Sequence, residues 1–370
     1  MIIKNATVYG KDFLPQVSDI EIDGQIIKSV GISKKDGEDF SGCAVIPGFI
    51  DVHIHGCNAA DATDGKPDSV QKMSEWLVTK GVTSFCPTTM TLPEDELEAS
   101  FRYAANTIGN ENGAYIHGIN MEGPFISQAK KGAQAGEHII TPDIELLKKL
   151  NSICPIKIVV VAPEVDGALD FIKKAKDICT VSIAHTAGNY ADGIAAIKSG
   201  ATHATHLYNA MNGLTSREAG MVGAVLDSKE VNAELICDGI HICEPTLRIT
   251  FAALGEDRTV VISDAMMAAG LPDGDYTLGG QRVIKKSDAR LADGTLAGSV
   301  TNLFDEFHNL LSFGVPLKQA LKSVSINPAK AIGVDKTTGS IEEGKFADLI
   351  ITSPDFKEIK AVFVKGKRII

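Results

Sequence analysis

Eight strand-like segments alternate with helical segments across the middle of the chain, and this alternation limits the fold more than any other feature. The first such segment is FIDVHIH (49–55) and the last is TVVISDAM (259–266). Between the first two strands, Val70, Met73 and Leu77 recur with helical spacing. Eight consecutive strand–helix units predict a (β/α)8 barrel. A doubly wound open sheet is the alternative, but no GxGxxG motif follows the first strand to support a dinucleotide site.

Both ends of the chain are rich in strand-like segments, unlike the alternating middle. Residues 1–47 indicate short strands around an Asp23-Gly24 turn, and residues 339–370 show the same style of pattern. We therefore expect three parts. Residues 48–338 form the barrel, and residues 1–47 and 339–370 pair as one small split β-sandwich domain.

The composition excludes several classes of protein. The chain has 370 residues, of which 44% are hydrophobic, and its net charge is −11. An acidic excess argues against a nucleic-acid-binding protein, and no apolar run approaches the roughly 18 residues that a membrane span needs. The seven scattered cysteines include no CxxC pair, and the N-terminus lacks a signal-peptide pattern. We therefore expect a reducing compartment, the cytoplasm, and no cysteine-based zinc site.

Residues of metal-ligand type occur where the predicted strands end. Barrel enzymes place their sites at the carboxyl ends of the strands, so these side chains should meet at one rim. Six of the eight ends carry such residues: His53 and His55, Glu122, His185, His206, Asp238 with His241, and Asp264.

The pair His53 and His55 lies two positions apart on one strand, so both imidazoles should point to the same side. Imidazole is a common ligand of zinc and iron. A bare pair of this kind is equally compatible with packed core histidines. Convergence with Glu122, His185 and the other rim residues favours metal ligands.

Two positions allow more than one interpretation. His203 precedes His206 by three residues and competes with it, and the spacing alone does not choose between them. Asp264 follows an apolar strand, where an uncompensated carboxylate would be costly. A metal or a proton-transfer role explains Asp264 better than a helix N-cap.

Several motifs resemble one known family. The run from Pro47 to Gly56 resembles the strand-one signature of the amidohydrolase superfamily, whose split sandwich domain also fits the two β-rich ends. More narrowly, the chain resembles the N-acetylglucosamine-6-phosphate deacetylases nearly end to end. The motifs that carry this likeness are MEGPF (121–125), HLYNAM (206–211), CDGIH (237–241), SDA (263–265) and LAGS (296–299).

The resemblance implies a metal site. Glu122, His185 and His206 match ligands shared by the family, and the HLYNAM context selects His206 over His203. His53 and His55 match members that hold a second metal, with Glu122 bridging and Asp264 completing the site. We therefore expect one or two divalent metals per chain. Histidine and carboxylate ligands suit zinc, iron and manganese alike.

The resemblance also implies the remaining roles. Asp264 matches the catalytic acid/base, and Arg217 and His241 match residues that bind the sugar phosphate. Gln134 stands where relatives often have histidine, and it can still hydrogen-bond a sugar hydroxyl. The other expected substrate-binding residues are Ala133, Asn209, Ala210, Asp238, Leu296, Ala297 and Gly298.

The resemblance implies hydrolysis of N-acetylglucosamine 6-phosphate to glucosamine 6-phosphate and acetate by metal-activated water. It also implies a role in amino-sugar metabolism and a homodimer. One alternative is an amidohydrolase for N-acetylgalactosamine 6-phosphate or for a cyclic amide. Cyclic-amide hydrolases usually bridge their metals with a modified lysine on strand four, and this strand ends in VAPE (161–164) without one. Another alternative is a non-catalytic assembly protein, which would be expected to lack ligands, although none is missing here.

Overall fold

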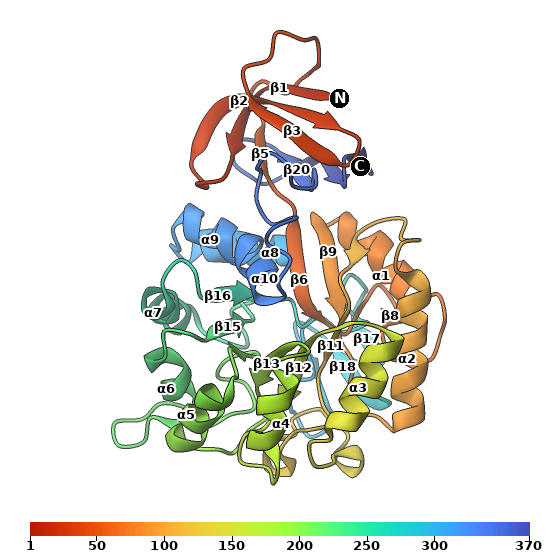
Figure 1. The fold of residues 1–370 in the computed structure, drawn as a ribbon, viewed down its shortest axis with the longest axis vertical. Coiled ribbons are helices and arrows are strands. Elements are labelled where there is room, and N and C mark those ends of the chain that lie inside the picture. Colours follow the sequence, from red (N-terminus) through yellow and green to blue (C-terminus); the bar gives the residue numbers. More distant parts are fainter.

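The computed structural model describes residues 1–370 as a sheet that contains both termini, standing on a larger body (Figure 1). We call this sheet the end sheet. Its eight strands have the order β22-β21-β20-β5-β1-β2-β3, with β4 beside β1. The strands are β1 (Ile2–Tyr9), β2 (Pro15–Asp23), β3 (Ile26–Gly31), β4 (Glu38–Asp39), β5 (Ala44–Pro47), β20 (Leu349–Thr352), β21 (Ile359–Val364) and β22 (Lys367–Arg368).

The two ends of the chain meet where β20 runs antiparallel to β5, with Leu349 opposite Pro47. The predicted pairing of the ends is therefore confirmed, whereas the two-layer sandwich stays a prediction. The β2–β3 hairpin is present, but Asp23 pairs with Ile26, so its turn residues are Gly24 and Gln25. Gly24 has φ +58°, a conformation that glycine adopts without steric cost.

Strand β20 of the end sheet is buried on both faces, and its neighbouring residues point to opposite sides. Leu349 and Ile351 belong to a separate core that also contains Ile3 and Phe363. Ile350, between them, packs into the main core of the body. The alternation therefore gives the end sheet a core of its own and also docks it on the body.

A parallel framework forms the body. One sheet contains β6 (Phe49–Ile54), β9 (Val82–Pro87) and β10 (Tyr115–Ile116), and the other contains β11 (Ile119–Met121), β12 (Ile156–Val161), β13 (Thr180–Ile183), β14 (His203–Ala204), β15 (Asn232–Leu235) and β16 (Thr259–Val261). The predicted strand 114–124 is divided into β10 and β11. Between them Gly118 has φ +141°, and a Cβ there would lie 2.3 Å from the Pro155 carbonyl oxygen.

Hydrogen bonds join the edges of the two sheets. Thr88, after β9, forms a parallel bridge with Asn120 of β11. On the other side the Asp264 amide donates to the His53 carbonyl at 2.9 Å, and the Ser263 hydroxyl donates to Asp51 at 2.6 Å. The alternation of strands and helices is confirmed, and the complete (β/α)8 barrel stays a prediction.

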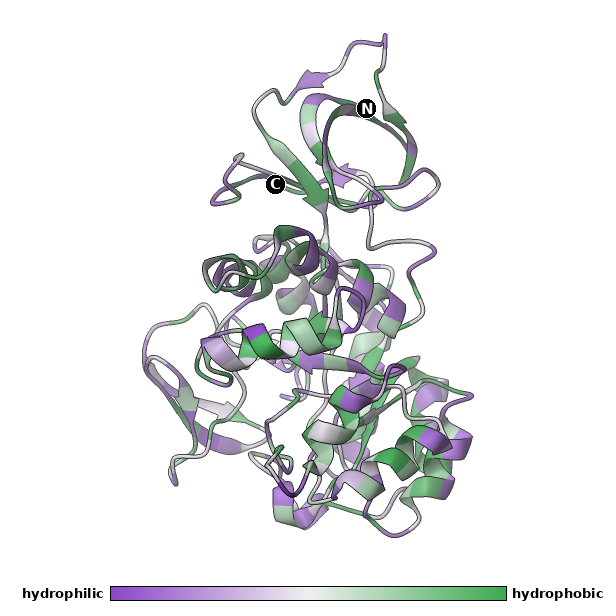
Figure 2. Cartoon of the chain, turned by 90° about the vertical axis from the view of Figure 1, so that its left-hand side faces the viewer, coloured by the Kyte–Doolittle hydropathy of each residue, from purple (hydrophilic) through white to green (hydrophobic).

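Ten helices surround these sheets, and Figure 2 shows hydrophilic and hydrophobic residues alternating along them. The side chains of Asp143, Asn189 and Asn302 cap the first turns of α3, α5 and α8. The helices are α1 (Ser69–Val78), α2 (Glu94–Thr107), α3 (Ile144–Ile153), α4 (Ala168–Ala175), α5 (Tyr190–Ser199), α6 (Gly220–Asp227), α7 (Glu244–Leu254), α8 (Leu303–Ser312), α9 (Leu317–Ser323) and α10 (Ile326–Ala331).

The remaining strands are short or lie in connections. They are β7 (Gly56–Cys57), β8 (Ala60–Asp61), β17 (Gly274–Leu278), β18 (Gln281–Lys285) and β19 (Ala289–Arg290). Two 3-10 turns, Gln128–Lys130 and Gly136–His138, lie in the segment after Glu122. None of the helices has the length and apolar character needed to cross a membrane.

A buried carboxylate secures the junction between the end sheet and the body. Asp348, just before β20, accepts hydrogen bonds from the hydroxyls of Tyr115 and Thr338 at 2.9 and 2.7 Å and from the Lys365 amide at 2.8 Å. Tyr115 belongs to β10 of the body, so this bond crosses the junction.

We predict that Asp348→Ala lowers the free energy of unfolding by about 2–4 kcal/mol, because buried donors lose their only charged acceptor. Urea denaturation measures this change. Asp12→Ala is the control, since Asp12 is exposed and should change stability by less than about 0.5 kcal/mol. Equal effects of the two substitutions would contradict a special role for the junction.

Candidate metal centre

Six buried side chains converge where the parallel strands end, and they form two groups of possible metal ligands. His53, His55 and Asp264 make one group, and Glu122, His185 and His206 make the other. Within each group the ligand atoms lie within 4.8 Å of one another. These are the six residues predicted from the sequence to bind metal, and the fold brings all of them together.

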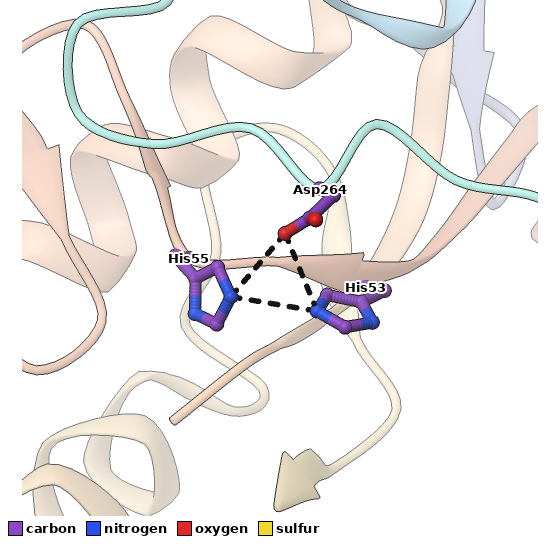
Figure 3. Close-up of side chains that lie close together, drawn as sticks. All are labelled: His53, His55 and Asp264. Atoms are coloured by element: carbon purple, nitrogen blue, oxygen red, sulfur yellow. Dashed lines mark hydrogen bonds and ion pairs between the residues drawn. The ribbon is translucent and has the colours of Figure 1, made fainter. Parts of the chain in front are cut away.

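In the first group, the imidazoles of His53 and His55 both point toward the carboxylate of Asp264 (Figure 3). Asp264 Oδ1 lies 3.4 Å from His53 Nε2 and 3.3 Å from His55 Nε2. The two Nε2 atoms are 3.4 Å apart. The predicted common direction of His53 and His55 is therefore present, although His55 lies just past the end of β6.

In the second group, Glu122 lies between two imidazoles. Its Oε1 is 3.1 Å from His185 Nε2 and 2.9 Å from His206 Nε2. Its Oε2 faces the first group, 3.2 Å from His55 Nε2. Glu122 therefore contacts both groups, as a bridging ligand would.

Unusual backbone conformations direct three of these side chains inward. His185, His206 and Asp264 have φ values of +45°, +31° and +47°. Such left-handed conformations cost about 1–3 kcal/mol each in non-glycine residues and cluster at functional sites. No helix starts at Asp264, so it does not serve as an N-cap.

The outer nitrogens of three imidazoles have acceptors that orient the rings. His55 Nδ1 lies 3.3 Å from the Thr88 carbonyl oxygen, and His185 Nδ1 lies 2.9 Å from that of Lys130. His53 Nδ1 lies 3.0 Å from Glu234 Oε2. With these nitrogens donating, the Nε2 lone pairs face the centre of the cluster.

The carboxylates and imidazoles of the cluster stabilise one another's charged forms. Burial raises the pKa of Glu122, but the charge of His53 and His185 and hydrogen bonds from His185 and His206 outweigh it and lower the pKa well below its usual value. The pKa of Asp264 is also lowered, because His53 and His55 overcome its burial. Burial opposes charge on His53 too, yet Asp264, Glu234 and Glu122 raise its pKa to about 9, so a bound metal takes the place of the proton on His53 Nε2.

The donor set fits divalent metal ions. Ligand atoms about 2.0–2.2 Å from one tetrahedral zinc are about 3.3–3.6 Å apart. The Nε2 atoms of His53 and His55 are 3.4 Å apart, and those of His185 and His206 are 3.2 Å apart. Four imidazoles and two carboxylates without cysteine suit zinc, iron or manganese.

A cavity of about 320 Å³ opens above the two groups, a volume within the range of small-molecule sites. Five of the six ligand candidates line this cavity, namely His55, Glu122, His185, His206 and Asp264, and His53 does not. The lining also includes Ala133, Gln134, Asn209, Ala210, His241, Leu296 and Gly298, all predicted as substrate-binding residues.

Comparison with known proteins bears directly on this site. The model of the amidohydrolase family matches residues 44–369. The chain belongs to the amidohydrolase family. It is 38% identical over 327 residues to an N-acetylglucosamine-6-phosphate deacetylase of Bacillus subtilis (strain 168), an alignment that covers 86% of this chain and 83% of the relative.

Two further comparisons bear on the substrate and on the fold. An N-acetylgalactosamine-6-phosphate deacetylase of Escherichia coli O157:H7 is 33% identical over 91% of this chain and 89% of its own length. A solved structure of an N-acetyl-D-glucosamine-6-phosphate deacetylase mutant of Mycobacterium smegmatis, in complex with N-acetyl-D-glucosamine-6-phosphate, has a TM-score of 0.93 at 27% identity. It covers 100% of this chain and 99% of that one. This amidohydrolase is therefore similar to phosphorylated-sugar deacetylases in both sequence and fold.

Other predicted residues of this amidohydrolase lie outside the cavity lining. Asp238 accepts hydrogen bonds from the amide and the Nδ1 of His241, both at 2.8 Å, so it orients that ring from behind. Ala297 is fully buried between two residues of the lining. Arg217 is exposed in the loop after β14, outside the cavity of its own chain. Its role at the phosphate stays a prediction.

The structure separates His203 from His206. His203 Nε2 lies 3.0 Å from Glu234 Oε1, away from both ligand groups, and only His206 joins the cluster. Sequence reasoning missed Glu234. The available signal was an acidic residue inside the apolar strand NAELIC, where an isolated charge is costly. It also missed six lining residues: Met90, Ala129, Lys130, Gly132, Leu278 and Thr295.

Gln134 is engaged by protein groups on both sides. Its amide nitrogen donates to Glu122 Oε2 at 2.7 Å, and its amide oxygen accepts from the Thr91 amide at 2.7 Å. These bonds hold the Glu122 carboxylate in place. A contact between Gln134 and a sugar hydroxyl stays a prediction.

We predict more than one metal ion per chain in protein prepared with ample zinc, iron or manganese, measured by elemental analysis after desalting. His53→Ala should lose one ion and keep the one at Glu122, His185 and His206, because His53 belongs only to the first group. A saturated wild type that holds a single ion would contradict the two-group interpretation.

Proposed function

We propose that this amidohydrolase hydrolyses N-acetylglucosamine 6-phosphate to glucosamine 6-phosphate and acetate. The main support for the proposal is a pair of metal-ligand groups, both in contact with Glu122, whose residues line a cavity of small-molecule size. Similarity to deacetylases of phosphorylated N-acetyl sugars supports the choice of substrate.

The proposed chemistry divides between metal and protein. Glu122, His185 and His206 would hold one divalent ion, and His53, His55 and Asp264 a second. When bound, such ions would supply Lewis acidity toward the amide carbonyl and lower the pKa of water. Asp264 acts as general base on the attacking water and then as general acid toward the leaving sugar nitrogen. Its side chain reaches the cavity and is ionised, so it is able to accept the first proton.

The cavity walls would position the sugar. His241, oriented by Asp238, presents its free Nε2 to the cavity, and Asn209 lines the same space. Arg217 offers a planar fork for the phosphate. Since Arg217 lies outside its own cavity, we propose a homodimer in which the Arg217 loop serves the neighbouring subunit. Within a single chain, the basic side chain of Lys130 also lines the cavity.

We also propose that residues 48–338 close into a (β/α)8 barrel, with residues 1–47 and 339–370 as a split β-sandwich domain. The hydrogen bonds across both pairs of sheet edges and the separate core of the end sheet support this division. The compartment that we propose is the cytoplasm, in keeping with the seven unpaired cysteines.

Acetate release tests the function. We predict rapid release from N-acetylglucosamine 6-phosphate, poor release from free N-acetylglucosamine, and loss of activity with a chelator that zinc, iron or manganese reverses. Asp264→Asn should lower kcat about 10²–10⁴-fold, because proton transfer is lost. N-acetylgalactosamine 6-phosphate is the comparison substrate. Higher kcat/KM for it, or chelator-resistant activity, would contradict the proposal.

Arg217→Ala tests phosphate recognition. We predict that KM for the phosphorylated sugar rises about 10- to 100-fold, because a hydrogen bond to a charged group contributes about 1.5–3 kcal/mol. Activity on free N-acetylglucosamine serves as the internal control and should hardly change. Equal loss on both substrates would indicate a structural role for Arg217 instead.

A further inference from the structure

Glu234 is a fully buried carboxylate in the middle of β15 that the proposed reaction does not use. Its Oε2 lies 3.0 Å from His53 Nδ1, and its Oε1 lies 3.0 Å from His203 Nε2. It therefore bridges an imidazole of the candidate metal centre and an imidazole outside it.

This geometry decides which ring nitrogens carry protons. An ionised carboxylate only accepts hydrogen bonds, so His53 Nδ1 and His203 Nε2 must both donate. The proton on His53 Nδ1 leaves the Nε2 lone pair facing His55 Nε2 and Asp264 Oδ1, 3.4 Å from each. His53 is thus held in the tautomer that a metal ligand needs.

Glu234 differs from the groups that orient the other imidazoles. His55 and His185 donate to neutral backbone carbonyls, those of Thr88 and Lys130. A carboxylate acceptor makes the imidazole a stronger ligand than a carbonyl does, because it stabilises positive charge on the ring. His53 is the only ligand candidate with a charged acceptor on its outer nitrogen.

The hydrogen bonding of His203 indicates that this residue orients the Glu234 carboxylate. It is fully buried, and its Nδ1 has no hydrogen-bond partner. Leaving a buried polar atom unpartnered costs about 1–3 kcal/mol. Its single hydrogen bond, to Glu234, fixes the second carboxylate oxygen and so the direction in which the first one faces.

We propose that Glu234, held by His203, is a positioning residue for the metal ion at His53, His55 and Asp264. It sets the tautomer and direction of His53, and its charge strengthens binding of that ion in particular. The selectivity follows from contact: Glu234 bonds the imidazole of His53, whereas its contact with the second group is a longer one, 3.4 Å from Oε2 to the backbone amide of His206, and not to an imidazole. The inference rests on the two-metal site of the proposed function.

The test is the affinity of the two metals in Glu234→Gln, which keeps the shape and removes the charge. Zinc titrations against a chromophoric chelator give the two dissociation constants. We expect the dissociation constant of the first group to rise about 10- to 100-fold and that of the second group to change less than threefold. His53→Ala, which removes a ligand of the first group, identifies which constant belongs to it.

Glu306→Gln is the matched control. Glu306 is a buried glutamate of α8 whose two carboxylate oxygens have no hydrogen-bond partner, and burial raises its pKa well above the usual value. Glutamine mimics its neutral form, so both zinc constants should stay unchanged. Equal weakening of both metals in Glu234→Gln, or no change in either, would overturn the proposal.

A measurement on the unaltered protein keeps the proposal testable if Glu234→Gln does not fold. Proton–nitrogen correlation spectra of the zinc-loaded, histidine-labelled protein should show His53 protonated at Nδ1, identified by the signal missing in His53→Ala. Protonation at Nε2, or a wild type that binds only one zinc, would overturn the inference. A protein that binds two zinc ions but releases no acetate would refute only the proposed function.

Discussion

The central constraint on this structure is the burial of two carboxylates, Glu122 and Asp264, at the ends of parallel strands. Removing such charges from water costs several kcal/mol each unless opposite charge and hydrogen bonds compensate. Four imidazoles surround them with ligand atoms about 3 Å away, and the proposed divalent cations would complete the compensation. The left-handed backbone at Asp264 is retained because the surrounding bonds hold that side chain in the cluster.

The strand ends explain why the ligands could be predicted from the sequence. His53 and His55 share a side because strand residues alternate, and parallel strands bring their carboxyl ends to one edge. The same rule could not choose between His203 and His206, because β14 has only two residues and the chain then turns at His206. Motif context made that choice. Glu234 was missed because its partners come from other strands, which no local pattern reveals.

The residues that line the substrate side of the cavity are harder to predict from sequence patterns than the metal ligands. Its walls come from loops, such as the segments around Gln134, Asn209 and Leu296, and residue spacing does not fix loop geometry. Arg217 is an example, because it was predicted to bind the substrate but lies exposed in a loop, outside the cavity of its own chain. The end sheet was predictable as paired termini because both ends of the chain are rich in strand-like segments. The Asp348 junction was not, because it depends on Tyr115 in a distant strand.

Anomalous X-ray diffraction from metal-loaded crystals of Asp264→Asn, grown with N-acetylglucosamine 6-phosphate, locates the metal and the sugar in one experiment. We predict an anomalous peak among Glu122, His185 and His206, with the acetamide group of the sugar facing it in the cavity. A metal bound elsewhere, or a sugar whose acetamide points away from these three side chains, would contradict it.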